Sequence, residues 1–86
     1  MPNTLHFTLY SRSYCHLCDD MLQALRASDR TGVFAIDVID VDADPALVAL
    51  YDELVPVLFG RKGDGEPVEL CHYHLDLEKL NAFLER

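Results

Sequence analysis

The sequence predicts an α/β fold in which a mixed four-stranded sheet is flanked by helices. Strand-like apolar runs occur near residues 5–10, 33–41, 57–59 and 68–71, and stretches with helical spacing of apolar residues lie between and after them. The order of elements is therefore β-α-β-α-β-β-α. Because a helix separates the first two strands, we expect them to be parallel, with a right-handed crossover. The last two strands are expected to form an antiparallel hairpin.

The first two elements are predicted from two different periodicities. Apolar and more polar residues alternate over residues 5–10, which indicates a strand. A helix is expected over about residues 15–30, because Asp19 near its start and Arg26 near its end complement the helix dipole and Gly32 can end it. The apolar stripe of this helix consists of Leu17, Met21, Leu22 and Leu25.

The middle of the chain predicts a second strand and a short helix. Residues 33–41 are rich in apolar and β-branched side chains. Asp44 is a suitable N-cap, and Pro45 occupies the first helical position, where proline is tolerated. The apolar face of this helix is expected to contain Ala46, Leu47, Leu50, Tyr51 and Leu54.

The C-terminal part predicts a hairpin followed by a helix. Residues 60–65 are rich in glycine and form the expected turn. Asp76 can cap a helix that runs to about residue 85, and Leu75 and Leu80 match a hydrophobic staple. The buried side of the helix is expected to contain Leu77, Leu80, Phe83 and Leu84.

Length and charge restrict the classes of function. The 86 residues are enough for one domain, expected over residues 1–86. The net charge of −8 and the lack of a basic cluster predict no binding to nucleic acid and no attraction to an anionic membrane. No apolar run approaches the roughly 20 residues that span a bilayer, and residues 1–4 lack a secretory signal. We therefore expect a cytoplasmic monomer.

The most informative motif is Cys15-His16-Leu17-Cys18, which directly follows the first predicted strand and opens the first predicted helix. The unpaired N–H groups and the dipole at a helix start stabilise a thiolate, which is the attacking species in disulfide exchange. Side chains at i and i+3 have Cβ atoms about 5–6 Å apart, and a disulfide requires about 3.8 Å. A modest distortion therefore permits a bond. The alternative is a pair of ordinary thiols that happen to be close.

The segment Tyr10-Ser11-Arg12-Ser13-Tyr14-Cys15-His16-Leu17-Cys18 resembles the glutaredoxin frame Tyr-Ser-(Lys/Arg)-x-x-Cys-x-x-Cys. Residues 40–44 and the segment Val55-Pro56-Val57-Leu58 are similar to later elements of the same family. The resemblance covers nearly the whole chain. It implies a thioredoxin-like fold and a glutaredoxin-like thiol–disulfide oxidoreductase.

The resemblance also implies roles for single residues. Cys15 would be the exposed nucleophile and Cys18 the more buried resolving thiol. Val55 would offer its backbone to an extended substrate, with Pro56 in the cis form beside the dithiol. Arg12 falls where glutaredoxins place a basic residue that meets a glutathione carboxylate. We further expect the ring of Tyr14 to flank the site. The alternative is that this ring is partly packed under the same loop.

The expected partners follow from this chemistry. They are a disulfide-containing protein or small-molecule substrate and a thiol reductant, such as glutathione or an enzyme of the thioredoxin-reductase type. Glutathione is then a co-substrate, and no tightly bound cofactor is expected. The sequence departs from the family at residues 70–76, because glutaredoxins carry a Gly-Gly loop before the last helix and this segment has no glycine.

Two alternatives use the cysteines differently or not at all. Cys15, Cys18, Cys71 and His74 form a set of four residues that is suited to tetrahedral zinc, with His72 as a spare ligand. The other alternative is a protein-interaction domain that keeps the fold without redox chemistry. We favour no metal, because the first cysteine pair opens an amphipathic helix. We interpret Cys71 as a small buried hydrophobe, and His16 as either a cation that assists Cys15 or a solvent-facing residue.

Overall fold

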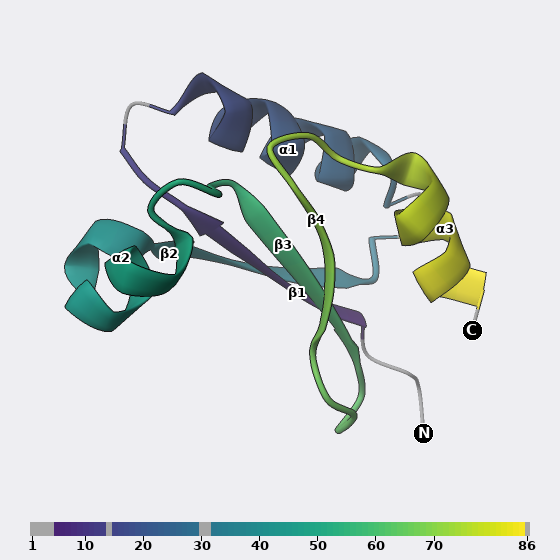
Figure 1. Ribbon diagram of the computed structural model, residues 1–86. Coiled ribbons are helices and arrows are strands. Elements are labelled where there is room, and N and C mark those ends of the chain that lie inside the picture. Colours follow the sequence, from purple (N-terminus) through teal and green to yellow (C-terminus); the bar gives the residue numbers. More distant parts are fainter. Residues whose placement is uncertain (1–4, 14, 30–31, 86) are drawn as a thin grey trace.

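The computed structural model describes residues 5–13, 15–29 and 32–85 (Figure 1). Its elements are β1 (Leu5–Ser11), α1 (His16–Ala27), β2 (Phe34–Asp40), the short 3₁₀ helix η1 (Val41–Ala43), α2 (Pro45–Tyr51), β3 (Val57–Lys62), β4 (Val68–His72) and α3 (Leu77–Glu85). The predicted order of strands and helices is confirmed, with η1 as an addition. Within the described part of the chain, no helix is long and apolar enough to cross a membrane.

The sheet has the strand order β2-β1-β3-β4. β1 pairs in parallel with β2, from Leu5 opposite Phe34 to Ser11 opposite Asp40, and in antiparallel fashion with β3. β3 and β4 form the predicted antiparallel hairpin, with a register shift between Leu58 and Phe59. The mixed four-stranded sheet of the sequence prediction is therefore confirmed.

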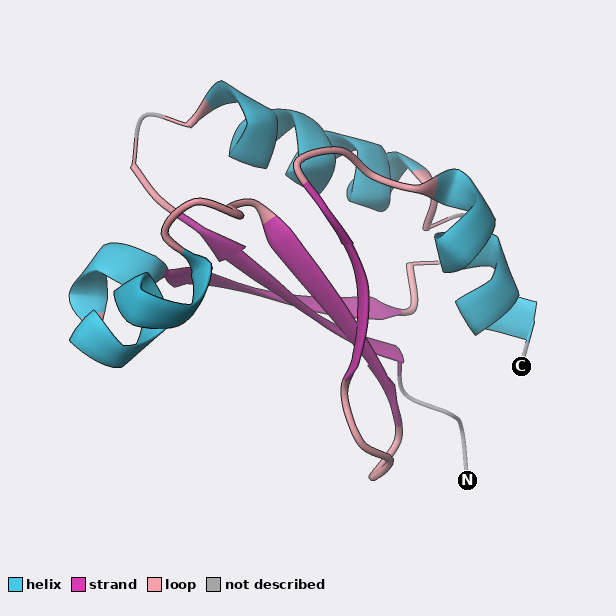
Figure 2. Cartoon of the chain, viewed as in Figure 1, coloured by secondary structure: helices cyan, strands magenta, loops and turns pink. Residues whose placement is uncertain are grey.

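Helices α1 and α3 cover one face of the sheet, and α2 lies toward the other (Figure 2). The core lies under α1 and α3 and consists of Phe7, Leu9, Met21, Leu25, Leu58, Leu70, Cys71, Leu80 and Phe83. On the other face, the rings of Tyr10 and Tyr51 stack with centroids 4.7 Å apart. No residue of α2 is buried, so this helix covers its face only partly.

Three details of the predicted helices are corrected. α1 ends at Ala27 and not near residue 30, because Ser28 forms the C-cap and the Asp29 carboxylate accepts two N–H donors at the start of β2. Leu17 on the predicted apolar stripe of α1 is 37% exposed, and Leu77 on the predicted buried side of α3 is 57% exposed. On the expected face of α2, Leu47 and Tyr51 are half-buried, whereas Leu50 is 63% exposed and Leu54 lies beyond the end of the helix.

The predicted helix caps are confirmed. The Asp44 side chain accepts from the N–H of Ala46 at 2.9 Å, and the Asp76 side chain accepts from the N–H of Lys79 at 3.1 Å. Each bond satisfies a donor that the first turn of a helix leaves without a partner in the helix. The caps fix where α2 and α3 begin, and so they fix the lengths of the loops that precede them.

Candidate active site

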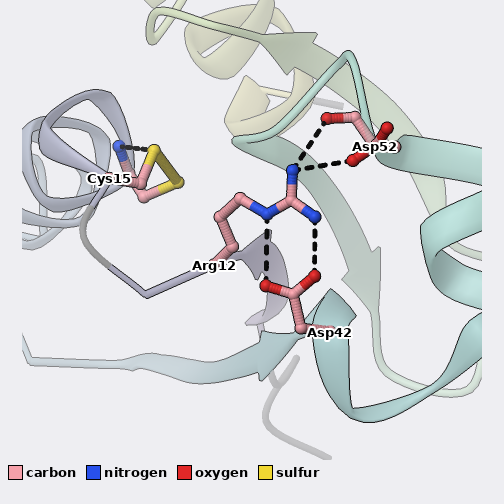
Figure 3. Close-up of a disulfide and its surroundings, with 5 residues drawn as sticks. Arg12, Cys15, Asp42 and Asp52 are labelled. Carbon is pink, nitrogen blue, oxygen red and sulfur yellow. Dashed lines mark hydrogen bonds and ion pairs between the residues drawn. A yellow bond between two sulfur atoms is a disulfide. The ribbon is translucent and has the colours of Figure 1, made fainter.

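Cys15 and Cys18 form a disulfide at the start of α1, with their Cα atoms 5.2 Å apart. Cys15 is the N-cap residue in extended conformation, and Cys18 lies in the first turn. Cys18 is only 4% exposed, whereas Cys15 is partly exposed. The structure therefore brings the two predicted sulfurs together in a disulfide (Figure 3). The more exposed of the two cysteines is at the helix terminus.

The surroundings of the Cys15 sulfur favour negative charge. The backbone N–H of Cys18 donates to Cys15 Sγ at 3.2 Å. Helix N-termini carry a partial positive charge, and donors aimed at a sulfur stabilise its anion.

The peptide bond between Val55 and Pro56 is cis, as the resemblance implied. Pro56 is buried and directly precedes β3, whose first residue Val57 lies opposite Tyr10 near the end of β1. Because β1 leads into the Cys15 loop, the sheet register places the cis bond and the disulfide at the same end of the sheet.

The N–H of Val55 is engaged within the described part of the protein, whereas its carbonyl is not. Its N–H donates to the carbonyl of Tyr51 at 3.1 Å. None of the described residues donates to its carbonyl oxygen. A main-chain contact between Val55 and a substrate stays a prediction.

Arg12 makes contacts that the sequence did not predict. Its Nε and Nη2 donate to both carboxylate oxygens of Asp42 at 3.2 and 2.6 Å, and its Nη1 donates to the Asp52 carboxylate at 2.7 Å (Figure 3). These hydrogen bonds raise the pKa of Arg12 above its ordinary value and lower the pKa of Asp42 below its ordinary value. The guanidinium thus ties the loop after β1 to η1 and to the end of α2. A contact between Arg12 and a substrate carboxylate stays a prediction.

The remaining predicted residues fall into three groups. Tyr14 lies outside the described residues. His16 is exposed, and Cys71 is 7% exposed in the core, which confirms its interpretation as a small buried hydrophobe. Burial raises the pKa of the Cys71 thiol, so this cysteine is a poor nucleophile.

The zinc alternative is not supported by the geometry. Among residues 5–13, 15–29 and 32–85, no three His, Cys, Asp or Glu side chains are grouped as metal ligands. The four proposed ligands, Cys15, Cys18, Cys71 and His74, are all in that described part. Cys15 and Cys18 are joined in a disulfide, and Cys71 is buried.

Sequence reasoning missed Tyr73, which is the described non-glycine residue with a positive φ, at 64°. Its N–H donates to the Pro56 carbonyl at 2.9 Å, and its hydroxyl donates to the Glu53 carbonyl at 2.6 Å. The signal that was available is the lack of glycine at residues 70–76, because some other residue must then turn the chain there.

A thioredoxin fold with a cysteine pair at the start of its first helix defines a protein of the thioredoxin superfamily. The model of the glutaredoxin-like domain (DUF836) matches residues 6–85, and the chain belongs to this family. No curated protein matches the sequence significantly.

Solved structures agree with this assignment. The chain is 38% identical to protein Ne2328 from Nitrosomonas europaea, with a TM-score of 0.77 and coverage of 96% of this chain and 92% of that one. It is also 38% identical to protein XcR50 from X. campestris, with a TM-score of 0.64 and coverage of 92% and 95%. Oxidised mitochondrial thioredoxin 3 from Saccharomyces cerevisiae shares the fold, at 15% identity, a TM-score of 0.66 and coverage of 96% and 78%. The fold and the cysteine pair are compatible with redox function.

Proposed function

We propose that the protein is a thiol–disulfide oxidoreductase that reduces disulfides or mixed disulfides with the Cys15–Cys18 pair. The observation that supports this most directly is the asymmetry of the pair. Cys15 is partly exposed and receives an N–H donor at a helix terminus, whereas Cys18 is buried behind it. This is the arrangement that an attacking thiolate and a resolving thiol require.

The proposed reaction has two steps. The Cys15 thiolate attacks one sulfur of the substrate disulfide, forms a mixed disulfide and expels the other sulfur as a thiolate. Cys18 then loses its proton and attacks Cys15 Sγ, which expels the second substrate thiolate and forms the Cys15–Cys18 disulfide. Two electrons pass from the protein to the substrate, and two thiols of a reductant restore the dithiol.

The proposed reductants are glutathione and an enzyme of the thioredoxin-reductase type. Glutathione carries two carboxylates and one ammonium group, and it would need a cation near the site. The nearest cation in sequence, Arg12, is engaged by Asp42 and Asp52. This contact favours the reductase-type donor. The choice is tested by comparing the rates at which glutathione and a thioredoxin-reductase-type enzyme reduce the Cys15–Cys18 disulfide of the oxidised protein.

The experiment that tests the function follows reduction of 2-hydroxyethyl disulfide by the pre-reduced protein. We expect Cys15→Ser to abolish the reaction and Cys18→Ser to stop it at a mixed disulfide on Cys15, visible by mass spectrometry. Cys71→Ala is the matched control and should retain the wild-type rate. We also expect alkylation of Cys15 to have its midpoint below about pH 8.5, the value of a free thiol. Equal activity of wild type and Cys15→Ser would refute the role of Cys15, and a wild-type protein that does not reduce the disulfide would refute the proposal and favour the non-redox interaction domain.

A further inference from the structure

Helix α2 has an apolar composition on all sides, yet it is not buried. None of the residues from Pro45 to Tyr51 carries a charge, and none of them is buried. A helix that is apolar all round normally lies inside a protein. Figure 1 shows α2 at the left edge of the molecule, where the sheet lies on only one side of it. The composition of α2 therefore suits an environment that the described part of the chain does not supply.

The exposed residues of α2 lie on one side of the helix. Leu47 and Tyr51 are half-buried, and the Tyr51 ring stacks against β1. Ala46, Ala49 and Leu50 are exposed, and Leu50 has 63% of its surface in contact with solvent. Residues three and four positions apart share one face of a helix. These three side chains therefore form a single apolar stripe that points away from the sheet.

The stripe continues into a hollow at the C-terminal end of the helix. The hollow has a volume of about 460 Å³ and is lined by Val48, Ala49, Leu50, Asp52, Glu53 and Leu54. Leu54 is 36% exposed there. We call Ala46, Ala49, Leu50 and Leu54 the outer stripe. An exposed apolar surface beside a hollow is typical of a site at which a partner inserts an apolar side chain.

Both ends of the outer stripe are acidic. Asp44 is the N-cap of α2, and Asp52 and Glu53 follow its last turn, which contains no basic residue. The C-terminal end of a helix carries partial negative charge, so acidic residues there are unfavourable without a cation. Arg12 pairs with Asp52, but no cation among the described residues pairs with the Glu53 carboxylate. A partner with positive charge would compensate this end of the helix.

The charges decide which partner fits the outer stripe. A second copy would bring the same acidic residues together, and each chain carries a net charge of −8. Asp44 and Asp52 are eight residues apart, which corresponds to about 12 Å along a helix. A partner helix with two apolar turns between basic residues matches this length and this charge.

We infer that the outer stripe of α2 is a docking surface for a basic amphipathic helix of another protein. The apolar side of that helix lies on Ala49 and Leu50, and its basic ends lie beside Asp44 and Glu53. No cysteine belongs to this surface. The binding therefore needs no disulfide exchange, and it is measured separately from the proposed reaction.

The test uses a fluorescein-labelled, end-capped helical peptide with leucines along two turns of one side and two lysines at each end. We expect saturable binding to the oxidised wild-type protein, measured by fluorescence anisotropy. Leu50→Ser should weaken the binding about tenfold, because it removes a large apolar side chain from the contact. Leu77→Ser is the matched control, since Leu77 is 57% exposed on α3, and it should retain the wild-type affinity.

The charge requirement is tested with a second pair of variants. Glu53→Gln should weaken the binding about threefold at low ionic strength and have little effect at high ionic strength, where exposed charges are screened. Glu78→Gln removes the same charge from the exposed side of α3 and is the control. A peptide with glutamates in place of the lysines should not bind.

Three results would overturn the inference. They are no saturable binding to the wild type, equal losses in Leu50→Ser and Leu77→Ser, and equal binding of the lysine and glutamate peptides. Self-association of the wild type that Leu50→Ser abolishes, seen by sedimentation velocity, would assign the outer stripe to a second copy instead. Because Leu50 is largely exposed, we expect the urea midpoint of Leu50→Ser to match that of the wild type. Failure to reduce 2-hydroxyethyl disulfide would refute the proposed function and leave this docking surface standing.

Discussion

Arg12 and Asp42 form a two-point ion pair in which Nε and Nη2 each reach one carboxylate oxygen, at 3.2 and 2.6 Å. Paired contacts of this type are directional and stronger than single ones. Asp52 adds a second carboxylate at 2.7 Å, so Arg12 and its two partners together carry one net negative charge. Arg12 lies three residues before Cys15, which places their Cα atoms within about 11 Å of each other.

From the charge of the Arg12, Asp42 and Asp52 cluster we predict that the protein distinguishes anionic from cationic disulfides. Asp42→Asn or Asp52→Asn should raise the rate with an anionic disulfide, dithiodipropionate, relative to a cationic one, cystamine. We expect a change in this ratio of about two- to fivefold at low ionic strength and a smaller one in 0.5 M salt. Asp64→Asn removes the same charge from the distant β3–β4 turn and is the control. A ratio that shifts equally in the control would assign the effect to net charge alone.

The same ion pair predicts a contribution to stability that depends on pH. The hydrogen bond from Arg12 lowers the pKa of Asp42 below its ordinary value of 3.8. Because the folded-state pKa is lower than the pKa in the unfolded chain, the ion pair stabilises the fold fully above about pH 3.8. This contribution is lost as the pH falls from there through the folded-state pKa. The difference in urea midpoint between wild type and Asp42→Asn should therefore be larger at pH 6 than at pH 3. A difference that does not change with pH would contradict this assignment.

From the buried thiol of Cys71 we predict that the folded protein loses stability at alkaline pH. Burial raises the pKa of its thiol above the ordinary value of 9.0. The folded protein therefore holds this proton more tightly than the unfolded chain, and stability falls as the pH rises above 9 toward the folded-state pKa. Cys71→Ala should have a lower urea midpoint at pH 8 because it leaves a cavity, but it should lose less between pH 8 and pH 10 than wild type. Parallel declines would show that other groups cause the alkaline effect.

The core under α3 leaves no room for a side chain at Gly60. A Cβ atom at this position would lie 2.9 Å from two ring carbons of Phe83 and 3.0 Å from Leu70 Cδ1. We expect Gly60→Ala to destabilise the fold by about 1–3 kcal/mol, the usual cost of overpacking, measured by urea unfolding. In a Phe83→Leu background the same change should cost less, because the ring is gone. An equal cost in both backgrounds would indicate a backbone effect instead.

The fold was predictable because its signals are local and repeated. Alternation, helical spacing and the Asp44 and Asp76 caps each depend on a few neighbouring residues, and the structure confirms the elements that they predict. The exposure of Leu17 and Leu77 was not predictable in the same way. Each residue fits an apolar stripe, but whether the end of a stripe is covered depends on how far a neighbouring element extends.

The candidate site was predictable in part for a similar reason. The cysteine pair and the cis bond before Val57 follow motifs that are contiguous in sequence. The partners of Arg12 lie 30 and 40 residues away, and those of Tyr73 lie on another loop. A single sequence gives no indication of such pairs, because any of the fifteen acidic residues is formally able to partner an arginine.

The burial of Cys71 in the core affects which disulfides the chain can form. Three thiols allow three intramolecular bridges while the polypeptide is still unfolded. Once α3 docks on the sheet, Cys71 is enclosed and two of those bridges are out of reach. The closed core therefore leaves Cys15–Cys18 as the bridge that the folded protein can form.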